Sequence, residues 1–220
     1  LIASIKNKMH AISPEVMEGL MEAVDLAEAE YQGMVIWSGD APFSVGADLE
    51  ATMPAFVVGG ADAIDSIEHE LQNLMLRIRY AQVPVVAAIH GMALGGGCEL
   101  SVYSARRVAH MESYMGLVEV GVGLVPGAGG LTYIARRAAE NAAASTGKDI
   151  LPFLSEGFTA AAMAKVGMSA LESRKLGYLL DSDIIVPHKD ELLFVAINEA
   201  KAMAADRKST RLNSSHRPLS

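Results

Sequence analysis

The feature that most constrains this chain is an apolar run followed by glycines, Val85–Ile89 and then Gly95–Gly97. Five consecutive Val, Ala and Ile residues predict a strand buried on both faces, as in a parallel sheet. The glycines then lead into a helix that begins near Cys98. Met34–Trp37 is a second short buried strand, and the polar turn Ser38-Gly39-Asp40 ends it. Short apolar strands that alternate with helices predict an α/β domain, whose topology the periodicity does not give.

Caps and helical spacing predict the other elements. Ser13-Pro14-Glu15 is a typical helix start, and apolar residues recur behind it down to Glu30. Ser169–Glu172 has the spacing of a capping box, and Gly177 ends that helix. The remaining expectations are strands over 1–5, 107–110 and 184–186, helices over 61–80, 127–140 and 190–205, and a loop with a helical turn over 114–121.

Composition excludes several classes of function. A chain of 220 residues suffices for one domain with a full core. A net charge of -8, with arginines clustered only in pairs, argues against nucleic acid as a partner. A single cysteine excludes an internal disulfide and favours a reducing, cytoplasmic location. No apolar run approaches the roughly 20 residues that span a membrane, and no Cys/His cluster has zinc spacing, so neither a membrane nor a metal is expected.

Both ends of the sequence look cut. The chain begins at Leu1, inside a predicted strand, which indicates a domain truncated at its N-terminus. From Lys208 to Ser220 the composition switches to Ser, Arg, Asn and Pro without any apolar period. We therefore expect one domain over residues 1–207 and a non-native, disordered tail over 208–220.

Three glycine-containing segments carry residues suited to chemistry. Phe43–Leu49 is a turn after a buried strand, in which Gly46 allows consecutive N–H groups to point outward. Gly95–Glu99 combines free N–H groups with the positive end of a helix, which is typical of an anion or oxyanion site. Glu119 precedes the third segment, Leu124–Gly130, which opens another helix.

Each segment also has a purely structural interpretation. A glycine turn is usually only a turn, Glu99 could complement a helix dipole, and Glu119 could be a solvated loop residue. Cys98 and His90 are expected to be packed side chains, because no activating partner is evident. A phosphate-binding loop is excluded because no Lys-Ser/Thr follows the glycines. A dinucleotide motif fails because Gly121-x-Gly123-x-x-Pro126 has Pro in place of its third Gly.

Taken in order, the three segments resemble the crotonase (enoyl-CoA hydratase/isomerase) family. PFSVGADL is similar to the family's first oxyanion loop, VPVVAAIHGMALGGGCEL to its central signature, and YMGLVEVGVGLVPGAGG to the segment with its second carboxylate. The resemblance extends from about Ser4 to Ala205. It is closest to the hydratase region of multifunctional proteins that also carry a 3-hydroxyacyl-CoA dehydrogenase. One departure is Val118, where many hydratases have Pro before the second glutamate.

The resemblance implies an α/β spiral of ββα repeats with C-terminal helices, truncated here, that hydrates 2-enoyl-CoA in fatty-acid β-oxidation. Glu99 and Glu119 would be the catalytic pair, with Glu99 mainly acting on water and Glu119 mainly on the α-proton. The N–H groups of Ala47 and Gly96 would form the oxyanion hole. The other expected substrate-binding residues are Ser44, Val45, Asp48, Leu49, Gly95, Pro126 and Gly127.

The resemblance also sets the expected ligands. The substrate itself carries coenzyme A, no cofactor is expected in this region, and NAD would enter only with an attached dehydrogenase. The expected partners are an acyl-CoA thioester and either further copies of the chain or an intramolecular dehydrogenase domain. Two alternatives remain open: an enoyl-CoA isomerase that uses Glu119 alone, and a non-catalytic relative that binds CoA or RNA. The presence of both glutamates favours hydration, and the acidic net charge argues against RNA.

Overall fold

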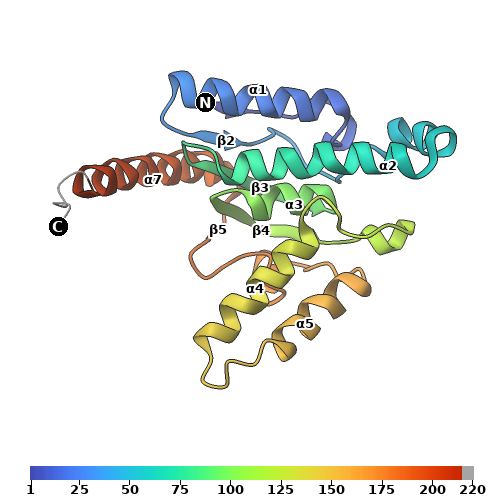
Figure 1. Ribbon diagram of the computed structural model, residues 1–220. Helices are drawn as coiled ribbons and strands as arrows, with labels where there is room; N and C mark the ends of the chain where they lie inside the picture. The colour runs from blue at the N-terminus through green and yellow to red at the C-terminus, as the bar shows by residue number, and fades with distance from the viewer. Residues whose placement is uncertain (215–220) are drawn as a thin grey trace.

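The computed structural model describes residues 1–214, and side chains up to Asp206. Its centre is a five-stranded parallel sheet whose strands lie in chain order (Figure 1). The strands are β1 (Ile2–Ala3), β2 (Met34–Ile36), β3 (Val85–Leu94), β4 (Arg106–Gly116) and β5 (Ile184–Val186). The two long strands, β3 and β4, pair along their whole length except for an irregularity between Ile89 and Gly91. The predicted α/β class with a parallel sheet is confirmed.

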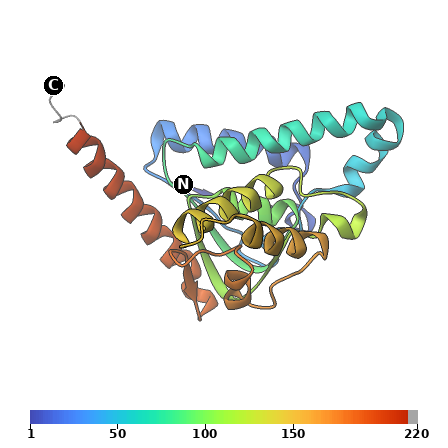
Figure 2. The ribbon, with the colours of Figure 1, turned by 60° about the horizontal axis from the view of Figure 1, so that its bottom comes forward.

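Alternate residues of the strands face two different layers. Met34, Val85 and Ala87 pack with α1 (Pro14–Glu30), α2 (Leu49–Arg79) and α3 (Gly96–Tyr103). Their neighbours Val35 and Val86 pack with α7 (Leu192–Ser214) on the other side. Figures 1 and 2 both show α1 and α2 side by side over one side of the sheet, with α7 leading away from it. The central stretches of β2 and β3, Met34–Ile36 and Val85–Ile89, are apolar at every position because both of their faces are buried.

The remaining helices are shorter than α1, α2 and α7, and in the view of Figure 1 α4 and α5 lie below the sheet. α4 (Gly130–Ala144) packs against α5 (Leu151–Ala162), and α6 (Ala170–Lys175) packs against β4. The single-turn helices are η1 (Lys8–His10), η2 (Glu119–Val122) and η3 (Lys189–Glu191). No helix within residues 1–214 is both long and apolar enough to cross a membrane.

The predicted helix caps are confirmed. The Ser13 hydroxyl accepts a hydrogen bond from the Val16 N–H at the start of α1, with Pro14 as the first helical residue. At α6 the Ser169 hydroxyl accepts from the Glu172 N–H. Both caps satisfy backbone donors that a helix cannot satisfy itself.

Two predicted elements need correction, and one helix was not predicted. The helix expected from residue 61 begins at Leu49, where the Asp48 carboxylate accepts from the Ala51 N–H, and it only kinks at Gly60. Pro54 and the glycines near the kink hide the helical pattern of this first part. The loop expected over 114–121 is partly strand, since β4 continues to Gly116 opposite the end of β3, and only η2 is the helical turn. The sequence analysis assigned no element to α5.

The C-terminal helix crosses the predicted end of the domain. α7 continues through Lys208 to Ser214, so the backbone does not change where the composition changes. Among the described side chains, its fully buried residues are Leu192, Ala196, Ala200 and Ala204, spaced four apart on one face. The part of the predicted tail over 215–220 lies outside the described residues.

Candidate active site

The first glycine turn is joined to the end of β3 by backbone hydrogen bonds. Ser44 N donates to Met92 O, and Leu94 N donates to Ser44 O. Gly46 has a φ of +94°, and a Cβ there would lie 2.8 Å from Leu94 O and 2.9 Å from Gly96 N. Only glycine permits both this conformation and this approach. The turn over 43–49 is therefore held directly against the glycines that open α3.

Two backbone amides, those of Ala47 and Gly96, lie close together at this junction. A Cβ placed on Gly96 would lie 3.5 Å from the Ala47 nitrogen. A Cβ is two bonds of about 1.5 Å from its own nitrogen, so the two amide nitrogens lie less than about 6.5 Å apart. Ala47 pairs with Ile12 in an isolated parallel β-bridge. The hydrogen bonds of this bridge are donated by the N–H groups of Ile12 and Asp48, so the bridge does not use the N–H of Ala47. Gly96 is the first residue of α3, where an N–H has no partner within its helix.

Glu99 enters the site from the first turn of α3. Its side chain is buried, and its Oε1 accepts a 2.7 Å hydrogen bond from the N–H of Gly130, the first residue of α4. Burial raises the pKa of Glu99 to about 8, with a further increase from the charge of Glu119. The Gly130 bond opposes this shift because it favours the ionised carboxylate.

Glu119 enters the site from a different element, at the start of η2. Its Oε1 lies 3.5 Å from the position of a Cβ on Gly95. Both carboxylate oxygens are buried, and neither has a hydrogen-bond partner among the described residues. Burial raises the pKa of Glu119 to about 7; the backbone N–H groups of Glu119 and Val118 nearby oppose this increase, and the charge of Glu68 adds to it. A buried carboxyl group without a partner is costly, so its oxygens are placed to bind a ligand or water.

Val118, the departure from the family pattern, has a φ of -113°. Proline holds φ near -65°, so a Pro here would require a different backbone at the entry to η2. The side chain of Val118 lines the same cavity as Glu119. This chain therefore presents its second glutamate on a backbone that a proline would not adopt.

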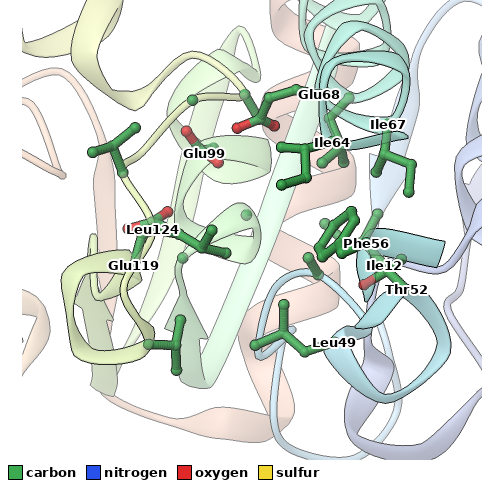
Figure 3. A pocket seen from close by; sticks show the side chains of 18 of the residues that line it. Ile12, Leu49, Thr52, Phe56, Ile64, Ile67, Glu68, Glu99, Glu119 and Leu124 are labelled. Carbon is green, nitrogen blue, oxygen red and sulfur yellow. The ribbon is translucent and has the colours of Figure 1, made fainter. Parts of the chain in front are cut away.

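These groups surround one cavity of about 190 Å³. Figure 3 shows Glu99 and Glu119 on one wall and side chains of α2 on the other. The predicted site residues that line the cavity are Val45, Ala47, Leu49, Gly95, Gly96, Glu99, Glu119 and Gly127. The other three lie elsewhere. Ser44 is buried in the turn and bonds the Gly46 N–H, Asp48 caps α2, and Pro126 is not among the lining residues.

The sequence analysis missed the wall that α2 contributes. Phe56, Ile64, Ile67 and Leu71 supply apolar surface, and Glu68 supplies a third carboxylate. Glu68 precedes Leu71 by three positions and Met75 by seven, which puts it on the apolar stripe of the helix. A charged residue on the apolar stripe of a helix is the sequence signal that could have identified Glu68. The lining residues before Gly60 could not be identified, because the sequence did not predict the part of α2 that carries them.

Two residues weighed for chemistry have structural surroundings instead. Cys98 is fully buried, and burial raises the pKa of its thiol well above the ordinary value. His90 is also buried, and its Nε2 lies 2.8 Å from Ser38 O. Neither lines the cavity. Within the described part of the chain, no three acidic, His or Cys side chains are grouped as metal ligands would be.

A family model described as enoyl-CoA hydratase/isomerase matches residues 3–169. The chain belongs to this family. A probable 3-hydroxyacyl-CoA dehydrogenase of Bacillus subtilis is 34% identical over 209 residues, which cover 93% of this chain and 25% of the relative. The peroxisomal bifunctional enzyme of Cavia porcellus is 39% identical over 130 residues, covering 58% of this chain and 17% of the relative. This member of the family thus spans at most about a quarter of these multifunctional relatives.

Solved structures of the family have the same fold. An enoyl-CoA hydratase from Polaromonas superposes with a TM-score of 0.75 at 24% identity, over 99% of this chain and 81% of that one. An enoyl-CoA hydratase from Bacillus anthracis superposes with a TM-score of 0.72 at 23% identity, over 91% of this chain and 71% of that one. At these identities the likeness concerns the fold alone. The predicted crotonase-like architecture is confirmed.

Proposed function

We propose that this chain hydrates 2-enoyl-CoA reversibly to 3-hydroxyacyl-CoA, as the hydratase region of a fatty-acid β-oxidation enzyme. One observation carries the proposal: Glu99 and Glu119 line one cavity together with the amides of Ala47 and Gly96. An acid, a base and two backbone donors around a mostly apolar space are what the reaction requires.

The two amides would bind the thioester oxygen. When water adds to the β-carbon, the π electrons of the double bond move toward the thioester and form an enolate oxygen. The N–H groups of Ala47 and Gly96 stabilise this charge, and one such donor is typically worth about 3 kcal/mol. The enolate then collapses as the α-carbon takes a proton. The backbone supplies these donors, so they persist when either glutamate is replaced.

The two carboxyl groups divide the proton transfers. One removes a proton from the attacking water, and the other delivers a proton to the α-carbon. With pKa values of about 8 and about 7, the pair holds roughly one proton near neutral pH, which provides an acid and a base together. Since the groups interact, the two proton losses belong to the pair.

We assign Glu99 mainly to the water and Glu119 mainly to the α-proton. Double-bond isomerisation, which needs proton transfer but no water, separates the roles: Glu99→Gln should retain more isomerisation than Glu119→Gln does. Equal losses would contradict the division while leaving the pair intact.

Ligands and context follow from the same proposal. The coenzyme A part would pass Ala47, Asp48 and Leu49, and the acyl chain would contact the apolar residues of α2. This region needs no cofactor, and NAD would serve only an attached dehydrogenase, the activity named for the Bacillus subtilis relative. A cytoplasmic location and assembly either into homo-oligomers or with a dehydrogenase domain belong to the proposal as well.

Assays of the full chain with two substrates test the reaction type. We expect 2-enoyl-CoA to gain water and 3-enoyl-CoA to isomerise more slowly. The unpartnered oxygens of Glu119 support isomerase activity as the second candidate, since that reaction can use one carboxylate. Isomerisation without hydration would favour the isomerase. Binding of CoA thioesters or RNA without turnover would contradict both enzymatic proposals.

A further inference from the structure

Glu68 is a third carboxylate in the cavity, and the pair of glutamates does not account for it. It is half-buried near the middle of α2 and lines the same space as Glu99 and Glu119. Its carboxylate has no hydrogen-bond or ion-pair partner among the described residues, and burial is the cause of its raised pKa. None of the residues that line the cavity is Lys, Arg or His. The negative charge of Glu68 therefore has no countercharge in the wall of the cavity.

The Glu68 carboxylate lies in the space that the missing side chain of Gly127 leaves. A Cβ on Gly127 would lie 1.9 Å from Glu68 Oε1 and 2.7 Å from its Cδ. One helical turn further along α2, Gln72 Nε2 donates a 2.8 Å hydrogen bond to Gly127 O. α2 is thus fastened to this turn by Gln72, and the missing side chain of Gly127 leaves room for the carboxylate.

The same turn also holds Glu99. Glu99 accepts from the Gly130 N–H, at the other end of the segment 127–130. In Figure 3 the carboxylates of Glu68 and Glu99 point toward one another across the top of the cavity. The charge of Glu68 acts on both Glu99 and Glu119, and disfavours a second negative charge on either.

We propose that Glu68 is a positioning residue for the proton of the site: its charge, in the space that Gly127 leaves open, helps to keep one proton on the Glu99–Glu119 pair at neutral pH. This inference rests on the proposed hydratase function and deepens it. Hydration needs one protonated and one ionised carboxyl group at the same time. Burial already raises the pKa of both members of the pair, and the negative charge of Glu68 in the same apolar cavity adds to it, which favours the mixed state over two ionised carboxylates.

Other titratable groups near the pair do not provide this effect. Cys98 of α3, Tyr103 of α3 and Tyr178 all have a raised pKa, caused mainly by burial, and are neutral at physiological pH. Burial also raises the pKa of Glu68, but in its half-buried position the group ionises more readily than a fully buried one. Among the described residues that act on Glu99, Glu119 of η2 and Glu68 of α2 are the carboxylates.

Two substitutions test this role of the Glu68 charge, one by removing the charge and the other by moving it. Glu68→Gln keeps the shape and removes the charge. Gly127→Ala keeps the charge and displaces it, and the backbone of Gly127 is outside the left-handed region, so Ala is not strained there. Glu70→Gln, two positions along α2 and exposed, is the matched control. Equal melting temperatures would show that the variants are folded.

The pH dependence of kcat/KM for hydration of 2-enoyl-CoA is the first readout. Both substitutions should lower the pKa of the essential acid, so the basic limb of the profile should move to lower pH by roughly half a unit to one unit. Glu70→Gln should leave it in place. In the double variant, Gly127→Ala should add no further shift to Glu68→Gln, because no charge is left to displace. An unmoved basic limb in Glu68→Gln, or additive shifts in the double variant, would overturn the proposal.

A second readout separates this inference from the proposed function. In the full chain with ¹³C-labelled glutamate carboxyl groups, NMR titration follows Glu99 and Glu119 directly, and Glu99→Gln and Glu119→Gln assign their signals. If the wild-type chain hydrates nothing, the proposed function fails, yet the titration midpoints should still fall in Glu68→Gln. Unchanged midpoints would overturn the role of Glu68 whether or not the chain is active.

Discussion

At Glu99, burial couples the chemistry of a single residue to the stability of the fold. The pKa of its carboxyl group is about 8 in the folded chain, against an ordinary value of 4.5. Between these values the unfolded chain has lost the proton and the folded site keeps it. The free energy of unfolding must therefore fall as pH rises through this window, by at most about 1.4 kcal/mol per pH unit for this group.

Urea denaturation at about pH 5.5 and about pH 7.5 measures this effect. We expect the wild-type free energy of unfolding to fall between the two conditions, and to fall less in Glu99→Gln, which has no proton to lose. Glu119 remains in both proteins, so the difference between the two slopes reports the loss of Glu99 together with its coupling to Glu119. The same pH dependence in wild type and variant would contradict a raised pKa at Glu99.

At the scale of elements, α2 forms one wall of the cavity on both sides of its kink. Phe56 lies before Gly60 and Ile64 after it. Gly60 has a φ of +59°, a conformation that side chains disfavour, and Gly60→Ala should cost roughly 1–2 kcal/mol. Gly19, exposed within α1 with open space around it, is the control, and Gly19→Ala should gain roughly 0.5–1 kcal/mol. Shifts of the melting temperature in the same direction would contradict a kink that depends on glycine.

Local signals explain which elements the sequence predicts. The Ser13 and Ser169 caps and the apolar strands depend on neighbouring residues, and these elements are found where the patterns place them. The first part of α2 is hidden because Pro54 and the glycines before residue 61 lower the helical signal, although its packing maintains it. Glu68 escaped notice because its contact with Gly127 joins segments far apart in the chain.

At the scale of the whole molecule, the site depends on one long-range junction. The turn at Ser44 bonds the end of β3, and this brings the Ala47 and Gly96 amides together. The order of the three glycine segments predicts which residues form the site, but only because it resembles the pattern of a known family. Composition and periodicity do not predict this, since they leave the pairing of distant segments open. Of the predicted binding residues, Asp48 serves a helix cap, a use that spacing alone does not reveal.

The C-terminal end of the fold offers another test. The described buried residues of α7 end at Ala204, before the change in composition at Lys208. Deleting residues 208–220 should therefore change the melting temperature by no more than about 2 °C, equivalent to less than about 1 kcal/mol for a chain of this size. A larger loss would show that the segment belongs to the native domain.

The hydration of a short 2-enoyl-CoA, followed through loss of absorbance of the conjugated thioester, tests the central claim most directly. Glu99→Gln and Glu119→Gln should each lower kcat by at least about 100-fold, the usual scale for losing a general acid or base. KM should stay within roughly threefold, because the amides of Ala47 and Gly96 remain. Glu70→Gln should behave as wild type. Full hydratase activity in either glutamine variant at the pair would contradict the two-carboxylate account.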